Sequence, residues 1–394
     1  MKDKSRVSYL LDVSRLVWRA WRGQLPTGID RTCLAYVRHY RRDARAVVQR
    51  GNFTRILCAD ASRRLFDCLL APGREKKAAL LHLAASAFLT SRANDVQAQF
   101  YLNVGHTGLD RAGHMAWIAR TSVRPIYFVH DLIPLTHPEY CRSGEPEKHL
   151  KRMTSLLTHG AGIIANSGDT LDQLAIFAGH QKPLDMVPTL VALLGADGQY
   201  STEMASSGDW VLPARPYFVL LGTIEGRKNH LLILNIWAEM VRRLGAECPL
   251  LIIIGRRGWE CEQVVDMLER CEVLRGHIVE LPHCSDAQLS AYLVSARALL
   301  FPSFAEGYGL PLVEALSHGT PVLASDLAVF REVAGDVPDY LSPIDGLGWM
   351  RAIEDYTVDG SVARSAQVER ISGWTAPTWQ AHFDLVDCWL AQLN

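Results

Sequence analysis

The chain has 394 residues, of which 48% are hydrophobic and 21% charged, and its formal net charge is −1. This length suits two domains of ordinary size, the composition is that of a globular protein, and the near-zero charge gives no indication of a nucleic-acid partner. Nine cysteines without Cys-x-x-Cys spacing predict reduced thiols. No apolar stretch reaches the length of a membrane span, so we expect a cytoplasmic protein.

Short apolar runs closed by polar residues predict the strands of the first half. A helix is expected over residues 32–40, and strands separated by helical lengths indicate a parallel sheet with ligands beyond the strand ends. Gly28 lies before that helix, where a glycine can approach a phosphate, and a plain turn is the alternative. His106, His130 and Asp131 follow strands, and a structural role is the alternative for His130. The predicted strands are 7–13, 55–59, 99–104, 125–129 and 162–165.

Residues 74–92 predict an amphipathic helix with a basic start at Arg74, Lys76 and Lys77. We favour a helix that faces the core of the first domain. The alternative is a surface that attaches weakly to anionic lipid.

A change to Gly, Ser, Asp, Ala and Pro over 195–216 predicts a linker before the second half. Arg227 and Lys228 follow the first strand of this half and precede a helix that ends near Leu244, a position that suits a diphosphate. A solvated basic turn is the alternative. A helix is expected from residue 346, and a terminal helix carries Trp379 and Trp389. The predicted strands of this half are 217–222, 249–255, 277–281, 298–301, 321–324 and 340–343.

The most informative stretch is 301–325, where a buried strand, a glycine-rich loop, a helix over 311–318 and another strand follow one another. Glu306 lies in the loop and Glu314 in the helix, and this order places both carboxylates on the ligand side of a parallel sheet. An ordinary strand-turn-helix with two solvated glutamates is the alternative.

These motifs together resemble the retaining nucleotide-sugar glycosyltransferases of family 4. The resemblance rests on Glu306-x7-Glu314 with its Gly-Tyr-Gly-Leu-Pro interior, on Gly222-Thr-x-x-x-Arg-Lys-Asn229, on Thr27-Gly28-Ile29, and on His130-Asp131 with Asn166-Ser167. It covers most of the second domain and little of the first. It implies the α/β GT-B architecture, in which two doubly wound Rossmann-like domains face each other across a cleft. The implied domains are an acceptor-binding domain over 1–205, a nucleotide-sugar-binding domain over 206–375, and a helix over 376–394 that crosses back to the first domain.

The resemblance also implies roles for particular residues. Glu306 would lie near the transferred sugar, Glu314 at the ribose hydroxyls, and Arg227 with Lys228 at the leaving diphosphate. The implied catalytic residues are Glu306, Arg227, Lys228 and His130. The implied donor-binding residues are Gly28, Gly222, Thr223, Cys284, Gly307, Tyr308, Gly309, Leu310 and Glu314, and the implied acceptor-binding residues are Asp131 and His106.

The function implied is transfer of a hexose from a nucleotide-diphosphate sugar, with GDP-mannose or a related GDP-sugar preferred, to a glycan in surface polysaccharide biosynthesis. The acceptor is expected to be lipid-linked, on the inner face of the cytoplasmic membrane. No Asp-x-Asp stands where a metal-dependent transferase needs it, so we expect no cofactor and no divalent metal. The alternatives are a UDP-sugar donor, a non-catalytic sugar-nucleotide or polysaccharide-binding protein, and a sugar-nucleotide epimerase, which lacks support because no first-strand Gly-x-Gly-x-x-Gly occurs.

Overall fold

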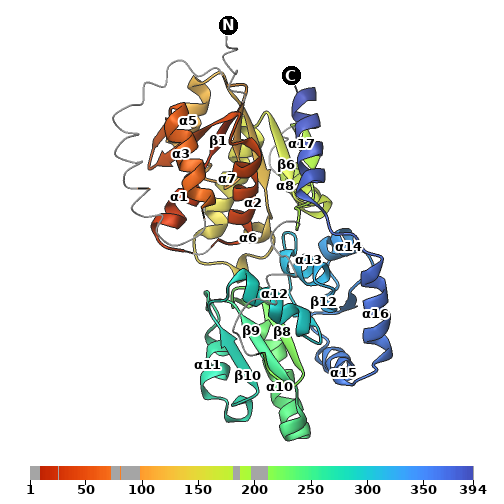
Figure 1. Ribbon diagram of the computed structural model, residues 1–394. Coiled ribbons are helices and arrows are strands. Elements are labelled where there is room, and N and C mark those ends of the chain that lie inside the picture. Colours follow the sequence, from red (N-terminus) through yellow and green to blue (C-terminus); the bar gives the residue numbers. More distant parts are fainter. Residues whose placement is uncertain are drawn as a thin grey trace. The chain divides into compact units, whose positions relative to one another are not determined.

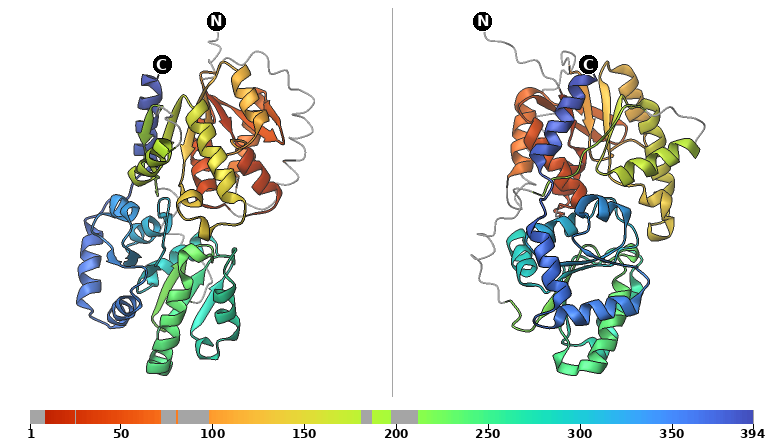
Figure 2. Two further views of the ribbon diagram at one scale, coloured as in Figure 1. Left: turned by 180° about the vertical axis from the view of Figure 1, so that it is seen from behind. Right: turned by 90° about the vertical axis from the view of Figure 1, so that its right-hand side faces the viewer.

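The computed structural model describes residues 9–24, 26–71, 80, 98–180, 187–196 and 212–393. Two compact units can be distinguished (Figures 1 and 2). Unit 1 contains Met1–Leu135, Gly144–Leu194 and His382–Asn394, and unit 2 contains Thr136–Ser143 and Gly195–Ala381. The predicted boundary between residues 205 and 206 lies outside the described residues. So does the predicted helix over 74–92, except for Leu80, which is buried.

Unit 1 is built on a seven-stranded sheet of order β3-β2-β1-β4-β5-β6-β7. Neighbouring described strands are parallel, except that β2 and β3 form an antiparallel pair. The strands are β1 (Tyr9–Asp12), β2 (Ala44–Arg50), β3 (Phe53–Ile56), β4 (Phe100–Asn103), β5 (Arg124–Val129), β6 (Gly162–Ala165) and β7 (Thr189–Val191). The helices are α1 (Ser14–Trp21), α2 (Gly28–Tyr40), α3 (Ala59–Leu70), α5 (Ala112–Arg120), α6 (Ile133–Thr136), α7 (Glu145–His159) and α8 (Gly168–His180).

The start of unit 1 differs from the prediction. The strand expected over 55–59 is β3, which ends at Ile56, and the chain then enters α3. Strand β2 was not predicted, because Arg45 and Gln49 interrupt its apolar run. Gln49 is nevertheless buried, since its side-chain amide donates to Asp12 at 2.7 Å and to the Tyr101 hydroxyl oxygen at 3.1 Å. A polar residue that finds such partners can occupy a core position of a strand.

Unit 2 is built on a six-stranded sheet of order β10-β9-β8-β11-β12-β13, parallel throughout its described strands. The strands are β8 (Tyr217–Leu221), β9 (Leu250–Ile254), β10 (Ile278–Leu281), β11 (Leu299–Phe301), β12 (Val322–Ser325) and β13 (Asp339–Leu341). The helices are α10 (His230–Leu244), α11 (Glu262–Arg270), α12 (Asp286–Ser295), α13 (Leu310–Ser317), α14 (Ala328–Ala334), α15 (Gly346–Thr357) and α16 (Val362–Ser372).

The core of unit 2 contains two fully buried tryptophans, and each indole N–H has an acceptor. Trp237 on α10 donates to the Pro249 carbonyl at 3.0 Å, and Trp349 on α15 donates to the Ser342 carbonyl at 2.9 Å. Pairing of this kind lets an indole contribute its large apolar area to the core without leaving a buried donor unsatisfied. Both helices are therefore fixed in rotation on the sheet.

Helix α17 (Trp379–Gln392) carries the chain from unit 2 into unit 1, where its residues contact α2. His382 lies 3.0 Å from the Tyr36 hydroxyl, and Asp387 accepts from the Tyr40 hydroxyl at 2.6 Å. The Phe383 ring stacks on His39 with centroids 3.9 Å apart. The last helix is thus part of the packed core of unit 1.

All nine cysteines are free thiols. None of the helices within the described ranges has the length and apolar character needed to cross a membrane.

Candidate active site

The candidate site of unit 2 lies where the strand order of its sheet reverses. The chain moves from β8 outward to β9 and β10, and then returns to the other side of β8 with β11. In an open parallel sheet, the crevice for ligands forms at such a reversal, beyond the carboxyl ends of the two central strands. The loops that leave these two ends carry Glu225, Arg227 and Lys228 after β8, and Ser303 and Glu306 after β11.

These two loops are joined by a cluster of charges around Glu306. Lys228 forms an ion pair with the Glu306 Oε1 atom, and the Arg227 Nη1 atom lies 2.9 Å from Oε2. The Ser303 hydroxyl donates to Oε1 at 2.7 Å. Arg227 also contacts the Glu225 carboxylate at 2.7 Å and the Ala305 carbonyl at 2.9 Å. Of the predicted residues, the structure therefore brings Arg227, Lys228 and Glu306 together.

The cluster is nearly withdrawn from solvent, since the side chains of Glu306 and Lys228 are only 7% and 9% exposed. Burial raises the pKa of Glu306, but Arg227 and Lys228 outweigh burial and bring its pKa down to about 2. Glu306 is therefore an anion throughout the physiological range. Burial raises the pKa of Glu225, while the neighbouring Arg227 and Lys228 act in the opposite direction.

Two stacked aromatic rings, Phe301 and Phe330, pack against the Lys228 side of the cluster. The Lys228 Nζ atom lies 4.8 Å from the centre of the Phe301 ring, a distance suited to a cation–π contact. Phe301 in turn stacks on Phe330 of α14 with centroids 4.9 Å apart. Gly309 precedes α13 with φ of +98°, and a side chain there would lie 2.7 Å from the Phe330 ring, so this position requires glycine.

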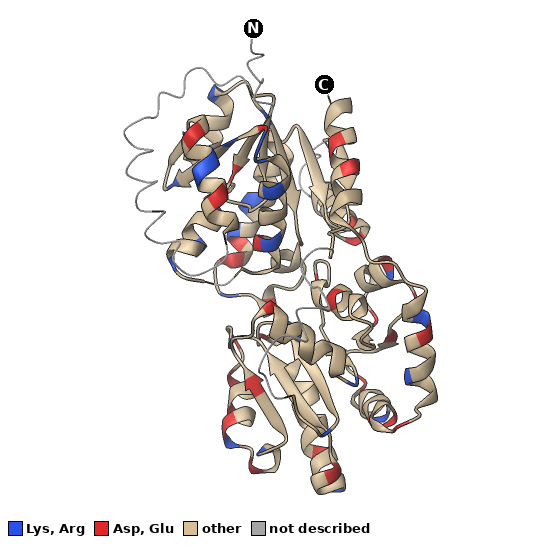
Figure 3. Ribbon diagram, viewed as in Figure 1, with Lys and Arg blue, Asp and Glu red and all other residues tan. Residues whose placement is uncertain are grey.

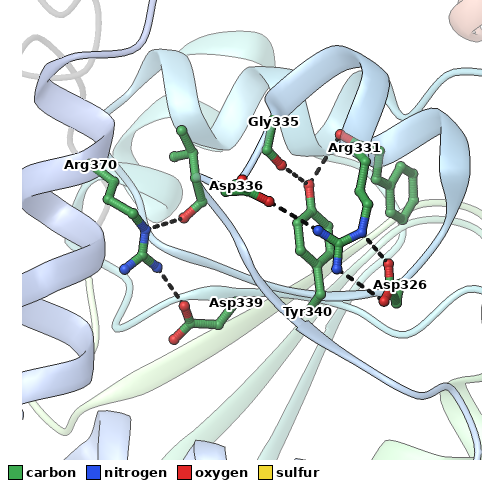
Figure 4. Close-up of polar contacts among 9 residues, drawn as sticks. Asp326, Arg331, Gly335, Asp336, Asp339, Tyr340 and Arg370 are labelled. Carbon is green, nitrogen blue, oxygen red and sulfur yellow. Dashed lines mark hydrogen bonds and ion pairs between the residues drawn. The ribbon is translucent and has the colours of Figure 1, made fainter.

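Helix α14 is itself held to the end of β12 and to β13 by the polar contacts in Figure 4. The Arg331 guanidinium donates to both carboxylate oxygens of Asp326, at 2.6 and 3.0 Å, and to Asp336 at 3.0 Å. The Tyr340 hydroxyl donates to the Gly335 carbonyl at 2.8 Å. These contacts position Phe330 and, through it, the start of α13.

The backbone of the loop after β8 is fixed by its neighbour after β9. A Cβ atom at Gly255 would lie 1.8 Å from the Gly222 carbonyl oxygen, so the two segments touch directly. Thr223 lies against Gly258 in the same way. Asn229 adopts a left-handed conformation with φ of +56°, and its side-chain amide donates to the Pro302 and Pro343 carbonyls. Residues 222–229 are thus held between the loops after β9, β11 and β13.

The remaining predicted residues of unit 2 lie on neighbouring elements. Gly307 and Tyr308 continue the loop after Glu306, and the Tyr308 side chain is buried. Leu310 begins α13, and Glu314 lies buried within that helix. Cys284 precedes α12, and burial raises the pKa of its thiol to about 11, so the thiol is neutral.

In unit 1, His106 and His130 follow the neighbouring strands β4 and β5, and their ring centroids lie 5.3 Å apart. The Nε2 atom of each faces a backbone carbonyl, that of Phe128 at 2.6 Å and that of Val104 at 2.7 Å. A carbonyl only accepts, so Nε2 carries the proton in both rings, and Nδ1 is an acceptor in the neutral form. Burial lowers the pKa of both, to about 4 for His130, so both are neutral near pH 7.

Two other predicted residues of unit 1, Asp131 and Gly28, lie next to the starts of helices. The Asp131 carboxylate accepts from the backbone N–H of Ile133 at 3.2 Å and so caps the start of α6. Its backbone carbonyl lies 3.1 Å from His149 Nε2. Gly28 is the first residue of α2, which begins four residues earlier than predicted.

Arg15, Arg19 and Asp30 beside Gly28 were not predicted as site residues. Asp30 is buried, accepts from the Thr27 backbone N–H at 2.7 Å, and pairs with Arg15 at 2.8 Å and Arg19 at 2.6 Å. The signal for this helix start was present, because Thr27 and Asp30 have the spacing of a capping box. The two arginines pair with Asp30 from α1, which was not predicted at all.

Acidic and basic residues are interspersed over the elements of each unit (Figure 3). Within the part of the chain that the structure describes, no group of three or more His, Cys, Asp or Glu residues is arranged to hold a metal ion.

Comparison with known proteins gives a consistent family signal. Residues 210–338 match the family described as glycosyl transferases group 1. The chain is 29% identical over 242 residues to the serotype-specific mannosyltransferase WbdA of Escherichia coli, a match that covers 58% of this chain and 29% of WbdA. It is 32% identical over 241 residues to the O-antigen chain mannosyltransferase B of Escherichia coli, covering 56% of this chain and 58% of that protein. The chain thus matches less than two thirds of the length of either relative.

Two solved structures resemble the whole chain in fold. Sucrose-phosphate synthase (tll1590) from Thermosynechococcus elongatus superposes with a TM-score of 0.67 at 15% identity, covering 98% of this chain and 99% of the other. Anabaena Alr3699/HepE in complex with UDP and glucose superposes with a TM-score of 0.66 at 17% identity, covering 97% and 99%. The predicted fold class, two α/β units with doubly wound parallel sheets of the GT-B type, is confirmed.

Proposed function

We propose that the chain is a hexosyltransferase that moves a hexose from a nucleotide-diphosphate sugar to a glycan in surface polysaccharide biosynthesis, and the match of residues 210–338 to the glycosyl transferases group 1 family supports this. The observation that carries this proposal is the cluster of Arg227, Lys228 and Glu306 at the reversal of strand order in unit 2. Two relatives named as mannosyltransferases support a mannose-type hexose. The preferred donor is therefore GDP-mannose or a related GDP-sugar.

The reaction breaks the bond between the anomeric carbon and the donor phosphate oxygen and forms a bond from that carbon to an acceptor hydroxyl oxygen. The hydroxyl proton ends on the leaving phosphate. Negative charge grows on the diphosphate as the bond breaks, and fixed cations stabilise that charge more in the transition state than in the ground state. Arg227 and Lys228 supply these cations, while Glu306 holds both side chains in place beside the sugar.

Retention of configuration at the anomeric carbon is part of the proposal, by a front-face route in which the leaving phosphate helps to deprotonate the acceptor hydroxyl. The neutral histidines of unit 1 suit contacts with sugar hydroxyls, because each offers an Nδ1 acceptor. We assign His130 to the donor sugar, and His106 with Asp131 to the acceptor. No divalent metal is required in this scheme.

The direct test is release of a nucleoside diphosphate when the protein is incubated with a nucleotide sugar and a glycan acceptor. A non-catalytic binding protein would release no nucleoside diphosphate. An epimerase would convert one nucleotide sugar into another, also without release of nucleoside diphosphate. The second candidate donor is a UDP-sugar, since a neighbour of the same fold binds UDP and glucose. A thermal-shift screen with GDP, UDP and ADP discriminates between the bases, since a ligand that binds the folded state raises the melting temperature.

We further propose that the enzyme works at the inner face of the cytoplasmic membrane, where a lipid-linked glycan would be its acceptor. The basic residues Arg74, Lys76 and Lys77 lead an apolar sequence that suits weak attachment to anionic lipid. Co-sedimentation with anionic liposomes at low salt, and release at high salt, is the expected result. Equal binding to neutral liposomes would assign residues 74–92 to the core of the first domain instead.

A further inference from the structure

The segment of residues 136–143 packs in unit 2, although the chain on both sides of it belongs to unit 1. It follows α6 and precedes α7, and it contains a short 3-10 turn over Pro138–Tyr140. It begins five residues after Asp131. The segment therefore belongs to unit 2, and its contacts are with residues of that unit.

The backbone of the segment is anchored on Trp259, in the loop after β9. The Trp259 indole N–H donates to the Tyr140 carbonyl at 3.2 Å, and the Arg142 guanidinium lies 4.7 Å from the centre of the indole ring. Trp259 is itself fixed, because the neighbouring Gly258 donates from its backbone N–H to the Ile224 carbonyl at 2.9 Å. The segment is thus attached to residues that also fix the loop after β8.

The Tyr140 ring contacts both loops that form the charge cluster. It stacks on Phe304 with centroids 5.5 Å apart and an angle of 7° between the planes. On the other loop, a Cβ atom at Gly226 would lie 3.4 Å from Tyr140 Cδ1, so the ring lies directly against the residue that precedes Arg227. The two loops meet beside the ring, where the Phe304 backbone N–H donates to the Arg227 carbonyl at 2.8 Å.

We propose that Tyr140 is a positioning residue for the Arg227–Glu306 cluster. Its ring covers the place where Gly226–Arg227 and Phe304–Ala305–Glu306 meet, and so it sets the separation of the guanidinium and the carboxylate. This inference deepens the proposed function and rests on it for its kinetic consequence. Catalytic groups that move by about 1 Å can lose on the order of 100-fold in rate, so a loosened cluster lowers turnover more than binding.

The test compares Tyr140→Ala with Tyr140→Phe, which keeps the ring. The alanine variant is expected to lose about tenfold or more in kcat while the KM for the donor changes about twofold or less, and the phenylalanine variant retains most of the turnover. Tyr9→Ala is a matched control, because Tyr9 is also half-buried and stacks on Phe100 in unit 1 with centroids 6.4 Å apart. In an Arg227→Ala background, Tyr140→Ala should cause little further loss.

A second readout does not depend on activity. Hydrogen exchange in peptides covering residues 302–307 should become faster in Tyr140→Ala and stay unchanged in Tyr140→Phe, because the Phe304 amide is held beside the ring. Unchanged exchange, or a kinetic loss that falls only on KM, would overturn the positioning role. If the wild-type protein releases no nucleoside diphosphate from any donor, the proposed function fails, and the exchange result still decides whether Tyr140 holds the two loops.

Discussion

Lys228 forms an ion pair with Glu306 while its ammonium nitrogen lies 4.8 Å from the centre of the Phe301 ring. The carboxylate and the ring lie on the same loop–strand segment, so Lys228 is held by two groups from β11 and the loop that follows it. A buried cation requires such partners to offset its desolvation. These two contacts hold the Lys228 ammonium, which comes from the loop after β8, against the loop after β11.

Replacing Arg227 or Lys228 with alanine should lower kcat more than it weakens donor binding. Both side chains lie where charge develops on the leaving diphosphate, and loss of one such group typically reduces the rate by roughly 10²–10³. Steady-state kinetics of donor turnover measures this split. Arg243→Ala is a matched control on the surface of α10, where the arginine pairs with Glu354. Near wild-type turnover in both variants would show that these side chains do not stabilise the leaving group.

Replacing Glu306 with glutamine should destabilise unit 2, because it leaves two largely buried cations without their shared anion. Breaking a buried ion pair from one side costs about 3–5 kcal/mol. Chemical denaturation measures the free energy of unfolding. In the control Asp359→Asn, the carboxylate is 99% exposed beside Arg297 and should contribute less than about 1 kcal/mol. Equal effects of the two substitutions would contradict the account of the cluster.

Stability should fall as the pH is lowered from 6.5 to 5, because buried histidines are neutral in the folded state. Burial lowers the pKa of both His130 and His382 to about 4, whereas an unfolded histidine titrates near 6.5. Between these values the unfolded chain binds more protons, so each group removes up to about 1.4 kcal/mol per pH unit. The pKa of Glu306 is about 2, so the stability that its ion pairs contribute is lost at a lower pH than the range from 6.5 to 5. A free energy of unfolding that stays constant from pH 7 to pH 5 would contradict this prediction.

Activity should persist in excess EDTA. Arg227 and Lys228 supply the positive charge that a divalent cation provides at the diphosphate in a metal-dependent transferase. The assay is donor turnover before and after chelation. Loss of turnover that Mg²⁺ or Mn²⁺ restores would show that a metal takes part.

The strands of unit 2 were predicted within one or two residues, and the signal was clearest for β8, β9 and β11, which are continuous apolar runs. Strand β8 was expected over 217–222 and spans Tyr217–Leu221, and β9 was expected over 249–255 and spans Leu250–Ile254. Strands buried on both faces leave such a signal in sequence. Near the start of unit 1, the polar residues of α1 and β2 obscure the apolar pattern, and both elements were missed.

The pairing within the candidate site could not be predicted from the sequence. The position of Arg227 and Lys228 between a strand and a helix suggested a diphosphate site, yet no local pattern shows that Glu306 accepts from Ser303 and pairs with both cations. The contacts of Arg227 with Ala305 and of Lys228 with Glu306 each span 78 residues of sequence. They depend on β8 and β11 being neighbours, which follows from the order of strands in the sheet. Tyr140 was missed for the same reason, since its partners Gly226 and Phe304 are distant in sequence.

The central claim is most directly tested with GDP-mannose labelled in the sugar, incubated with the protein and a lipid-linked glycan. The account predicts that label appears in the glycan and that GDP is released in equal amount. The matched reaction with Arg227→Ala should proceed roughly 10²–10³ times more slowly. Absence of both labelled glycan and released nucleoside diphosphate, with GDP-mannose and with UDP-sugars, would contradict the assignment of a hexosyltransferase.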